Sequence, residues 1–458
     1  MAVNETKNQT FQLLPGHQHD HAIAYRFAVK DAPAFRDEAY ITTEDDYLSK
    51  IDFELSSYSL PDVMTKNVSV SWEAMDKTLL DDVNFGGQIK RTGFLSDIAR
   101  TLLSQHTDTL ARVTAAYDFV RHSIKWNEES SLWSRSIKKV LDDKKGDAAD
   151  INLTLIALLR EMKMDAHPII LSTRKNGRIH EAYALLKKFN YVVAHVSVGG
   201  KDLILDATDP YLKPGMLPVH CLNGTGRLVH PTQARFISLA PSERDIEVHN
   251  AVFTLDEEGE VSGKLTHFHA GYSAWSARRQ FATDGKAKYL DGVRKKRTNW
   301  QVEQAEFTGT DLASNAFNAE FTLTIPEACT RAGDRLYFQP LLTEAHSDNP
   351  FKEPQRSYPV DFGVPIDETF SAMYTLPTGF QVEELPKPLA ITLPENGGRF
   401  TYQVGVVNGN LQVVSRISLR KAMYFADEYP FLRELFSQIV AKHAEQVVLK
   451  RGTVADKK

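Results

Sequence analysis

The sequence contains little cysteine and no long hydrophobic run, and each of these absences excludes a class of protein. Only two cysteines, Cys221 and Cys329, occur among 458 residues, and neither has a CxxC partner. A cysteine-rich zinc module and a dense disulfide framework are therefore excluded, and at most one disulfide can form. No stretch of about 18 apolar residues is present, so the sequence predicts no membrane span. The polar start, MAVNETKN, does not have the pattern of a signal peptide.

Basic residues do not gather in one block of the sequence. The 54 Lys and Arg residues are balanced by 59 Asp and Glu residues, which gives a net charge of -5. A chain without a basic patch offers little to nucleic acid or to an acidic membrane surface, so we expect no nucleic-acid partner. The 42% hydrophobic and 10% aromatic residues are typical of globular proteins. At about 100 to 200 residues per domain, the length predicts roughly two to four domains.

The hydrophobic pattern changes along the chain and predicts a multidomain α+β protein. Alternating apolar and polar residues between 20 and 72 indicate strands, and we assign residues 1–72 to an N-terminal β domain. Helical spacing then dominates, and short β-branched runs follow it. Helices followed by strands are typical of an α+β domain, which we assign to residues 73–240. Alternating strands return in residues 241–458, which predicts a C-terminal β-sandwich with a helical insertion over 270–294 and a closing helix over 429–449.

One predicted helix lies at the centre of the α+β region. The segment AADINLTLIALLREMKM is apolar all round, so we expect this helix to be buried. Asp147 precedes it and Asp150 follows three residues later, which is the spacing of an N-cap pair that complements the helix dipole.

Three segments of this region together resemble the core of the transglutaminase-like, papain-type superfamily. They are the Gly-Asp turn at 146–147 that opens the buried helix, the run FNYV at 189–192, and the run LDAT at 205–208. In that superfamily a Cys at the helix start, a His on the following strand and an Asp on the next strand form a catalytic triad. The helix terminus lowers the pKa of the thiol, the His shares its proton, and the Asp orients the His. The resemblance implies thiol acyl transfer or peptidase-like activity where the triad is intact.

Two of the three triad positions are substituted in this sequence. Ala148 occupies the Cys position, Tyr191 occupies the His position, and only Asp206 is retained. Alanine has no nucleophile, and a phenol with a pKa near 10 is a poor general base at neutral pH. Because the members of a triad act as a unit, we predict a catalytically inactive protein. We expect such a protein to be a binding or scaffolding module for a peptide, a glycan or another envelope protein.

The resemblance extends over nearly the whole chain. The segments 32–55, 221–229, 357–363 and 429–450 are similar to a bacterial family in which β domains precede and follow the core. Members usually begin with a signal peptide and a longer N-terminal domain. The resemblance therefore implies that the first β domain is incomplete here, and that the protein is exported or periplasmic.

Four residues are candidates for the wall of a ligand cleft. Trp126 and Trp133 flank predicted helices, and Asn190 and Tyr191 lie on the strand of the substituted triad. Aromatic side chains at such positions either pack in the core or stack against a peptide or a sugar.

Metal ligands are a further possibility in this sequence. His17, His19 and His21 have the spacing that places three imidazoles on one face of a strand, although a solvated segment is the simpler interpretation. Asp206 together with Asp209 is a second candidate, against a turn-stabilising role before Pro210. The alternative function is therefore a metal-dependent hydrolase that uses Asp206 or the histidine cluster.

Other acidic and histidine residues predict no cofactor. The acidic residues between 142 and 150 lack the spacing of a calcium loop, so Ca²⁺ or another divalent cation has no support from the sequence. His267 and His269 alternate on a predicted strand, and we expect them on an exposed face.

Overall fold

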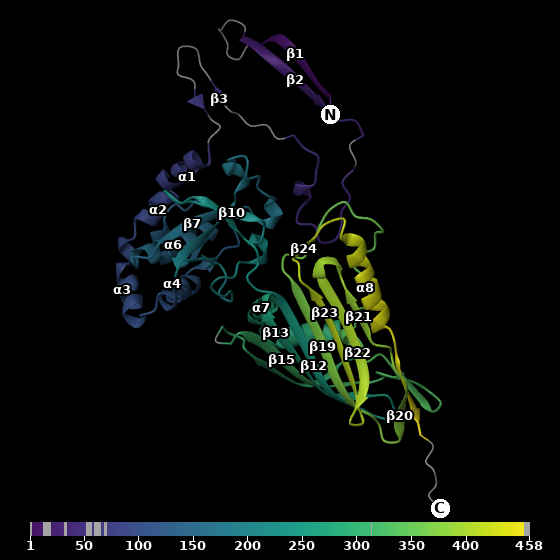
Figure 1. Ribbon diagram of the computed structural model, residues 1–458. Coiled ribbons are helices and arrows are strands. Elements are labelled where there is room, and N and C mark those ends of the chain that lie inside the picture. The colour runs from purple at the N-terminus through teal and green to yellow at the C-terminus, as the bar shows by residue number, and fades with distance from the viewer. Residues whose placement is uncertain are drawn as a thin grey trace, which may run out of the picture.

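The computed structural model describes residues 2–11, 20–31, 34–51, 57–58, 66–67, 71–312 and 314–452. The N-terminal part forms an antiparallel hairpin of β1 (Ala2–Phe11) and β2 (Asp20–Ala28), followed by the short pair β3 (Ser57–Tyr58) and β4 (Lys66–Asn67). The hairpin lies apart from the rest of the molecule at the N-terminal end (Figure 1). Between the two pairs the chain contacts the C-terminal domain, where Glu38 forms an ion pair with Arg356 at 3.2 Å.

The second part of the chain is an α+β domain in which helices precede a five-stranded sheet. The sheet has the order β11-β10-β7-β8-β9, and each neighbouring pair is antiparallel. Its strands are β7 (Ala166–Leu171), β8 (Tyr191–Val198), β9 (Lys201–Leu205), β10 (Thr225–Leu228) and β11 (Arg235–Ser238). The helices are α1 (Trp72–Asp81), α2 (Gly86–Lys90), α3 (Ser96–Gln105), α4 (Thr109–Ser123), α5 (Ile137–Asp143) and α6 (Ala148–Glu161). Two short parallel strands, β5 (Lys125–Trp126) and β6 (Lys145–Gly146), join the loop after α4 to the start of α6.

Helix α6 forms the centre of this domain, as its apolar sequence predicts. It packs against α2, α4 and α5 on one side and against β7 and β8 on the other. All residues from Ala148 to Leu159 except Asp150 are buried. A helix in this position needs apolar side chains on every face, because neighbouring elements surround it.

The C-terminal part is built on an eight-stranded sheet with the order β14-β15-β13-β12-β19-β23-β22-β21. Its strands are β12 (Asp245–Leu255), β13 (Val261–Gly271), β14 (Gln301–Thr308), β15 (Ala316–Ile325), β19 (Ile366–Thr375), β21 (Leu389–Thr392), β22 (Gly398–Val407) and β23 (Asn410–Leu419). Strands β12 and β19 are parallel, and the other neighbours are antiparallel. Figure 1 shows the twist of this sheet and α8 beside β21 and β22.

The layer that packs on this sheet is mixed, with a second sheet and two helices. Helices α7 (Tyr272–Lys296) and α8 (Tyr429–His443) contribute side chains to the same buried cluster as a four-stranded sheet. That sheet has the order β16-β17-β25-β20. Its strands are β16 (Thr330–Ala332), β17 (Arg335–Phe338), β20 (Phe380–Glu384) and β25 (Val447–Arg451). A separate two-stranded sheet consists of β18 (Val360–Asp361) and β24 (Met423–Tyr424). Helix α8 ends at His443, although the closing helix was predicted to extend to residue 449. The β-branched run after His443 forms strand β25 instead.

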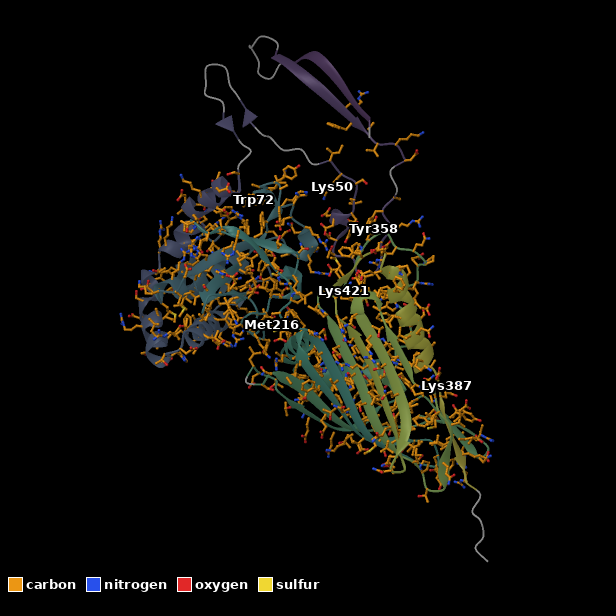
Figure 2. All side chains as sticks on the ribbon, in the orientation of Figure 1. Lys50, Trp72, Met216, Tyr358, Lys387 and Lys421 are labelled. Atoms are coloured by element: carbon orange, nitrogen blue, oxygen red, sulfur yellow. The ribbon has the colours of Figure 1, made fainter. Side chains whose placement is uncertain are left out.

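A buried cluster joins the α+β domain to the C-terminal domain. Met216, which Figure 2 labels at the boundary between the two, belongs to this cluster. Ala148 and Tyr191 contribute from the α+β side, and Tyr272 and Trp275 contribute from the start of α7. None of the helices in the described part of the chain combines the length and the apolarity that crossing a bilayer requires.

Candidate functional site

The start of α6 is held by a capping box. The Asp147 side chain accepts a hydrogen bond from the Asp150 backbone N–H at 2.9 Å, and the Asp150 side chain accepts one from the Asp147 N–H at 3.1 Å. A Cβ on Gly146 would lie 2.7 Å from the Asp150 Cβ, so only glycine fits before the cap. Burial raises the pKa of Asp147 to about 6. This turn directs Ala148 into the interior, where it is fully buried.

Tyr191 and Asp206 contact each other in the interior next to Ala148. The Tyr191 hydroxyl group donates a hydrogen bond to Asp206 Oδ2 at 2.9 Å and lies 3.2 Å from the Thr208 Oγ1. Ala148, Tyr191 and Asp206 are all 0% exposed. Tyr191 therefore contacts Asp206 directly, and it shares a buried cluster with Ala148.

The other carboxylate oxygen of Asp206 accepts two hydrogen bonds. Asp206 Oδ1 accepts hydrogen bonds from the Asn152 side-chain amide at 3.1 Å and from the Thr208 N–H at 3.0 Å. The bond from Thr208 makes Asp206 a turn-forming residue, as the simpler interpretation of the sequence proposed. Asn152 also accepts a bond from the Ala207 N–H at 2.9 Å and donates one to the Val192 carbonyl at 3.0 Å. These bonds connect α6, β8 and the turn after β9 in one network.

His220 and Cys221 also lie at this site, and the sequence analysis missed both. The Cys221 Sγ is 3.9 Å from Asp206 Oδ2, within hydrogen-bond distance for sulfur. The His220 ring stacks on Trp126 and meets the edge of Tyr191. From the sequence, Cys221 was considered only as a partner in a zinc module or a disulfide. The adjacent His-Cys pair was the available signal, but only the tertiary fold brings it to Asp206.

The protonation states at this site do not favour thiol chemistry. Burial, followed by the charge of Asp206, raises the pKa of the Cys221 thiol well above its usual value. Burial likewise raises the pKa of the Tyr191 phenol and lowers the pKa of His220. At neutral pH the thiol and the phenol are therefore protonated, whereas a reactive cysteine requires a thiolate.

The other cleft candidates are structural in this fold. The Asn190 side chain accepts a bond from the Thr173 N–H and donates one to the Thr173 hydroxyl group, at 2.9 and 3.0 Å. The Trp126 indole N–H donates to the Glu129 carbonyl at 2.9 Å. Trp133 is 38% exposed and packs edge-on against Phe85. The described cavities are not lined by Trp126, Trp133, Asn190 or Tyr191.

The predicted metal candidates have different outcomes. His17 and His19 lie outside the described residues, and the side chain of His21 is likewise not described. Asp209 does not join Asp206 in a cation site, because its Oδ2 lies 3.1 Å from Arg279 and its Oδ1 accepts a bond from the Tyr211 N–H. Among the described residues, Asp206 instead groups with His220 and Cys221, whose ligand atoms lie within 4.8 Å of one another.

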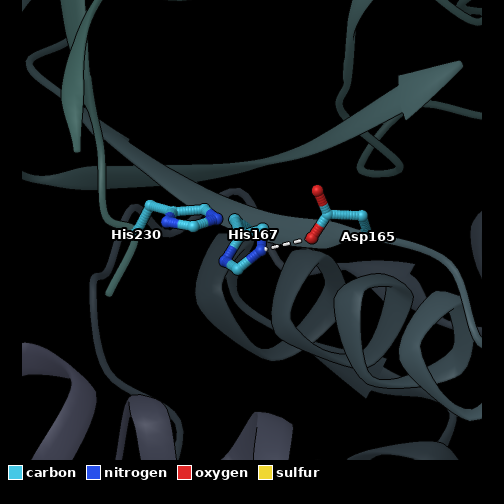
Figure 3. A group of neighbouring side chains, drawn as sticks. All are labelled: Asp165, His167 and His230. Carbon is cyan, nitrogen blue, oxygen red and sulfur yellow. Dashed lines mark hydrogen bonds and ion pairs between the residues drawn. The ribbon is translucent and has the colours of Figure 1, made fainter. Parts of the chain in front are cut away.

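A second group of this kind lies at the start of β7, where His167 is opposite His195 in the register. Figure 3 shows His167 between Asp165 and His230, with His167 Nε2 2.8 Å from Asp165 Oδ1. Arg160 lies 3.2 Å from the other ring nitrogen of His167. Burial lowers the pKa of His167 to about 4, so its imidazole is neutral at pH 7. Both ring nitrogens of this histidine already have partners.

A third group lies on the large C-terminal sheet and includes His249, His267 and Glu344. The expectation that His267 and His269 lie on an exposed face is wrong, because they are only 6% and 9% exposed. The alternation of the strand correctly placed the two histidines on one face. It did not show that α7 covers that face.

Two family models match separate parts of the chain. Residues 96–202 match the model of the transglutaminase-like superfamily, and residues 334–449 match DUF3858, a domain of unknown function with a solved structure. No curated protein sequence matches the chain.

One solved structure shares the fold over most of this chain. A "putative protease" from Parabacteroides distasonis has a TM-score of 0.53 and 13% identity, over 98% of this chain and 70% of that chain. A "putative cysteine protease" from Cytophaga hutchinsonii has a TM-score of 0.23 and 15% identity, over 33% of this chain and 48% of that chain. The first of these similarities supports the fold alone. The chain therefore contains a transglutaminase-like core domain and a C-terminal DUF3858 domain.

Proposed function

We propose that this protein is a catalytically inactive member of the transglutaminase-like superfamily that acts as a binding or scaffolding module. The observation that carries the proposal is the hydrogen bond from Tyr191 to Asp206 in a fully buried space. In an active enzyme this space holds a thiolate, an imidazole and the substrate carbonyl group. Here a protonated phenol and the methyl group of Ala148 occupy it.

Cys221 does not replace the missing nucleophile in this proposal. Its thiol donates a hydrogen bond to Asp206 and is fully buried, so a substrate carbonyl group has no route to the sulfur. A carboxylate beside a thiol disfavours the thiolate, which is the opposite of what a reactive cysteine needs.

The closed space also changes where a ligand would bind. We propose a peptide rather than a glycan, at a cavity of about 890 Å³ between α1, β7 and β10. Its wall carries charges of both signs and no Trp, Tyr or Phe side chain, and the charged lining includes Lys77, Asp81, Lys90, Arg160 and Asp165. Sugars usually stack on aromatic rings, whereas charged peptide side chains and termini pair with such groups.

The test of inactivity compares the wild-type protein with the Asp206→Asn variant. Both are assayed for acyl transfer from glutamine-containing substrates, for peptide hydrolysis and for labelling by thiol-directed electrophiles. We expect no turnover and no labelling of the native wild-type protein. Turnover by the wild type that Asp206→Asn abolishes would show an active enzyme.

The peptide cavity is tested with charge reversal. Lys77→Glu and Lys90→Glu should weaken binding of an acidic peptide at least about 10-fold, since each replaces an attraction with a repulsion of like charges. Lys138→Glu, on exposed α5 and outside the cavity lining, serves as the matched control. Equal binding by all three variants would rule out this cavity.

A metal-dependent hydrolase remains the alternative function, and the group of Asp206, His220 and Cys221 is the observation in its favour. Against it, both oxygens of Asp206 already accept hydrogen bonds from the network around Asn152 and Tyr191. Hydrolysis that a chelator abolishes and that Cys221→Ser weakens would favour this alternative over the inactive scaffold.

A further inference from the structure

The inner face of the large C-terminal sheet is divided into an apolar half and a polar half. Along β12, the inward positions change from Ala251, Phe253 and Leu255 to Asp245, Glu247 and His249. Along β13, they change in the same way from Val261 and Leu265 to two histidines, His267 and His269. Alternating inward positions of a strand are normally apolar, because burying a polar group without a partner costs free energy. The polar half is therefore a candidate site.

Two histidines face each other at the centre of the polar half. His249 on β12 and His267 on β13 are directly opposite in the antiparallel register, and their ring centroids lie 3.8 Å apart. Glu344, at the end of the short turn Leu342–Glu344, reaches both rings. Its Oε2 lies 2.7 Å from His249 Nδ1 and 3.9 Å from His267 Nε2. One ligand atom from each of the three residues lies within 4.8 Å of the other two.

Two imidazole nitrogens at this place lack a partner. Among the described residues, neither His249 Nε2 nor His267 Nε2 has a hydrogen-bond partner, although both atoms are buried. His267 is 6% exposed, so more than nine tenths of this residue is removed from solvent. Leaving a buried polar atom unsatisfied costs about 1 to 3 kcal/mol, so these two nitrogens point to a ligand.

We propose that His249, His267 and Glu344 bind a divalent transition metal ion, for which Zn²⁺ is the best match. Two imidazoles and one carboxylate are a ligand set that zinc uses, and imidazole also suits the neighbouring transition metals. Ca²⁺ and Mg²⁺ prefer oxygen ligands and do not match this set. The site lies in the C-terminal domain, so it is independent of the function proposed for the core.

The protonation states match those of metal ligands. Burial, followed by the proximity of His249, holds the pKa of His267 well below its usual value, so its imidazole is neutral. Burial alone would raise the pKa of Glu344, but hydrogen bonds from His249 and Arg297 outweigh it and hold this pKa well below the usual range. Metal ions bind neutral imidazole and ionised carboxylate, so neither group has to lose a proton first.

Arg297 and Glu247 complete the surroundings of the proposed ion. Arg297 donates two hydrogen bonds to Glu344, at 2.6 and 3.0 Å, and so fixes the carboxylate as outer partners do in metal sites. The guanidinium charge opposes a cation, but Glu247 offsets it with an oxygen 3.9 Å from His249 Nε2. The proximity of His269, whose Nδ1 lies 3.7 Å from Glu247 Oε1, is the main cause that lowers the pKa of Glu247 to about 2, so this second carboxylate is ionised.

A cavity adjoins the proposed ion. His249, Arg297 and Glu344 line a space of about 270 Å³ together with His346 and Glu368. Three protein ligands leave a fourth position of a tetrahedral zinc ion open, and a water molecule or a small polar ligand in the cavity would occupy it.

The other two groups of possible ligands lack these features. In the group around His167, both ring nitrogens of this histidine already have partners. In the group around Asp206, only one imidazole nitrogen, His220 Nε2, lacks a partner among the described residues. Only the group around Glu344 offers two unpartnered imidazole nitrogens among the described residues.

The experiment measures Zn²⁺ binding to the full chain after removal of metal. The background carries His17→Gln, His19→Gln and His21→Gln, because these N-terminal histidines could bind zinc by themselves. Zinc chloride is titrated by calorimetry, metal content is measured after dialysis, and thermal unfolding is followed with and without zinc. We expect one Zn²⁺ per chain and a higher unfolding midpoint with zinc, because a ligand that binds only the folded state stabilises it.

Single variants in the same background locate the ion. His267→Gln and Glu344→Gln should each weaken binding at least about 10-fold. His167→Gln, which changes the other histidine group, is the matched control and should bind as the background protein does. Absence of stoichiometric zinc from the background protein would overturn the proposal. This result does not depend on whether the single variants fold. Unchanged affinity in a folded His267→Gln variant would also overturn it.

Discussion

Tyr191 makes the closest contact to the Asp206 carboxylate in the buried interior of the α+β domain, at 2.9 Å. A phenol is longer than an imidazole and carries a hydroxyl group at its tip, and in this fold the hydroxyl group reaches Asp206 and Thr208. The Asp206 carboxylate, which would orient a histidine in an intact triad, therefore accepts a hydrogen bond from Tyr191 in the core. Asn152, Thr208 and Cys221 supply its other hydrogen bonds.

Removal of the Tyr191 hydroxyl group should therefore affect stability. We expect Tyr191→Phe to lower the free energy of unfolding by about 1 to 3 kcal/mol, because a buried oxygen of Asp206 loses its closest donor. Urea unfolding followed by circular dichroism measures this change. Tyr183→Phe, at a tyrosine that is 62% exposed, is the control and should change little. Equal stability of the two variants would contradict a structural role for the phenol.

His443 predicts a loss of stability at acidic pH. Burial, followed by the proximity of His346, lowers its pKa to about 3, whereas an unfolded histidine titrates near 6.5. Its contribution to stability is therefore present above about pH 6.5 and decreases as the pH falls toward 3, since only the unfolded chain takes up the proton. The loss is about 1.4 kcal/mol per pH unit within this window.

The measurement compares urea unfolding of the wild type and of His443→Gln at about pH 6.5 and about pH 5. Between these values the variant should lose about 2 kcal/mol less stability than the wild type. His122→Gln, on the exposed surface of α4, should behave as the wild type does. An identical acid loss in His443→Gln would show that other groups control this pH range.

At the scale of single elements, the start of α6 depends on its cap. Asp147 and Asp150 satisfy each other's backbone N–H groups, and the preceding glycine leaves room for the side chain of Asp150. Ala148 is the first residue of the helix after this cap. The role of the cap in this chain is therefore to anchor the helix in the interior.

The cap is tested by two substitutions of one residue. We expect Asp147→Ala to destabilise the protein by about 1 kcal/mol, within the usual range of about 0.5 to 2 for a lost N-cap. Asp147→Asn should remain close to the wild type, because asparagine also accepts the N–H bond and avoids burying a charge. Thermal unfolding of both variants measures the difference. A larger loss with asparagine than with alanine would contradict the capping role.

Several elements could be predicted from the sequence because local patterns determine them. The apolar residues of α6, its cap and the hairpin of β12 and β13 follow from spacing and turn residues over short distances. Strand β25 was missed, because its two valines continue a helical pattern and become a strand only beside β17 and β20. The domain boundaries at residues 72 and 240 remain predictions.

The candidate site was predictable only in part. The family pattern predicts that Ala148, Tyr191 and Asp206 are neighbours, and in the structure Tyr191 contacts Asp206 and shares a buried cluster with Ala148. Cys221 could not be placed in the same way, because its contact with Asp206 depends on how the loop before β10 folds back over the sheet. The prediction that His267 is exposed was wrong for a similar reason, since alternation along a strand does not show which face other elements cover.

At the scale of the whole molecule, one buried cluster joins the C-terminal domain to the α+β domain around Tyr191. Tyr272 and Trp275 at the start of α7 belong to the same buried cluster as Ala148 and Tyr191. The Tyr272 hydroxyl group also donates a hydrogen bond to the Leu217 carbonyl of the core, at 2.9 Å. The two domains therefore share one buried core around Tyr191.

An ion pair supports the same arrangement. Arg174 of the core lies 2.8 Å from Asp361 of the C-terminal domain, and both side chains are largely buried. Arg174 also donates a hydrogen bond to the Asp361 carbonyl at 3.1 Å. Because charge-assisted bonds of this kind are directional, they fix the orientation of one domain on the other.

The reactivity of Cys221 in the native protein tests the closed, inactive centre most directly. Alkylation by iodoacetamide is followed at this residue by mass spectrometry, for the native protein, for the protein in denaturant and for a Trp275→Ala variant. The closed centre predicts native modification at least about 100-fold slower than in denaturant, because the thiol reacts only after local opening, and faster modification in Trp275→Ala. Rapid alkylation of Cys221 in the native wild type would contradict a closed centre and would indicate an accessible, reactive thiol.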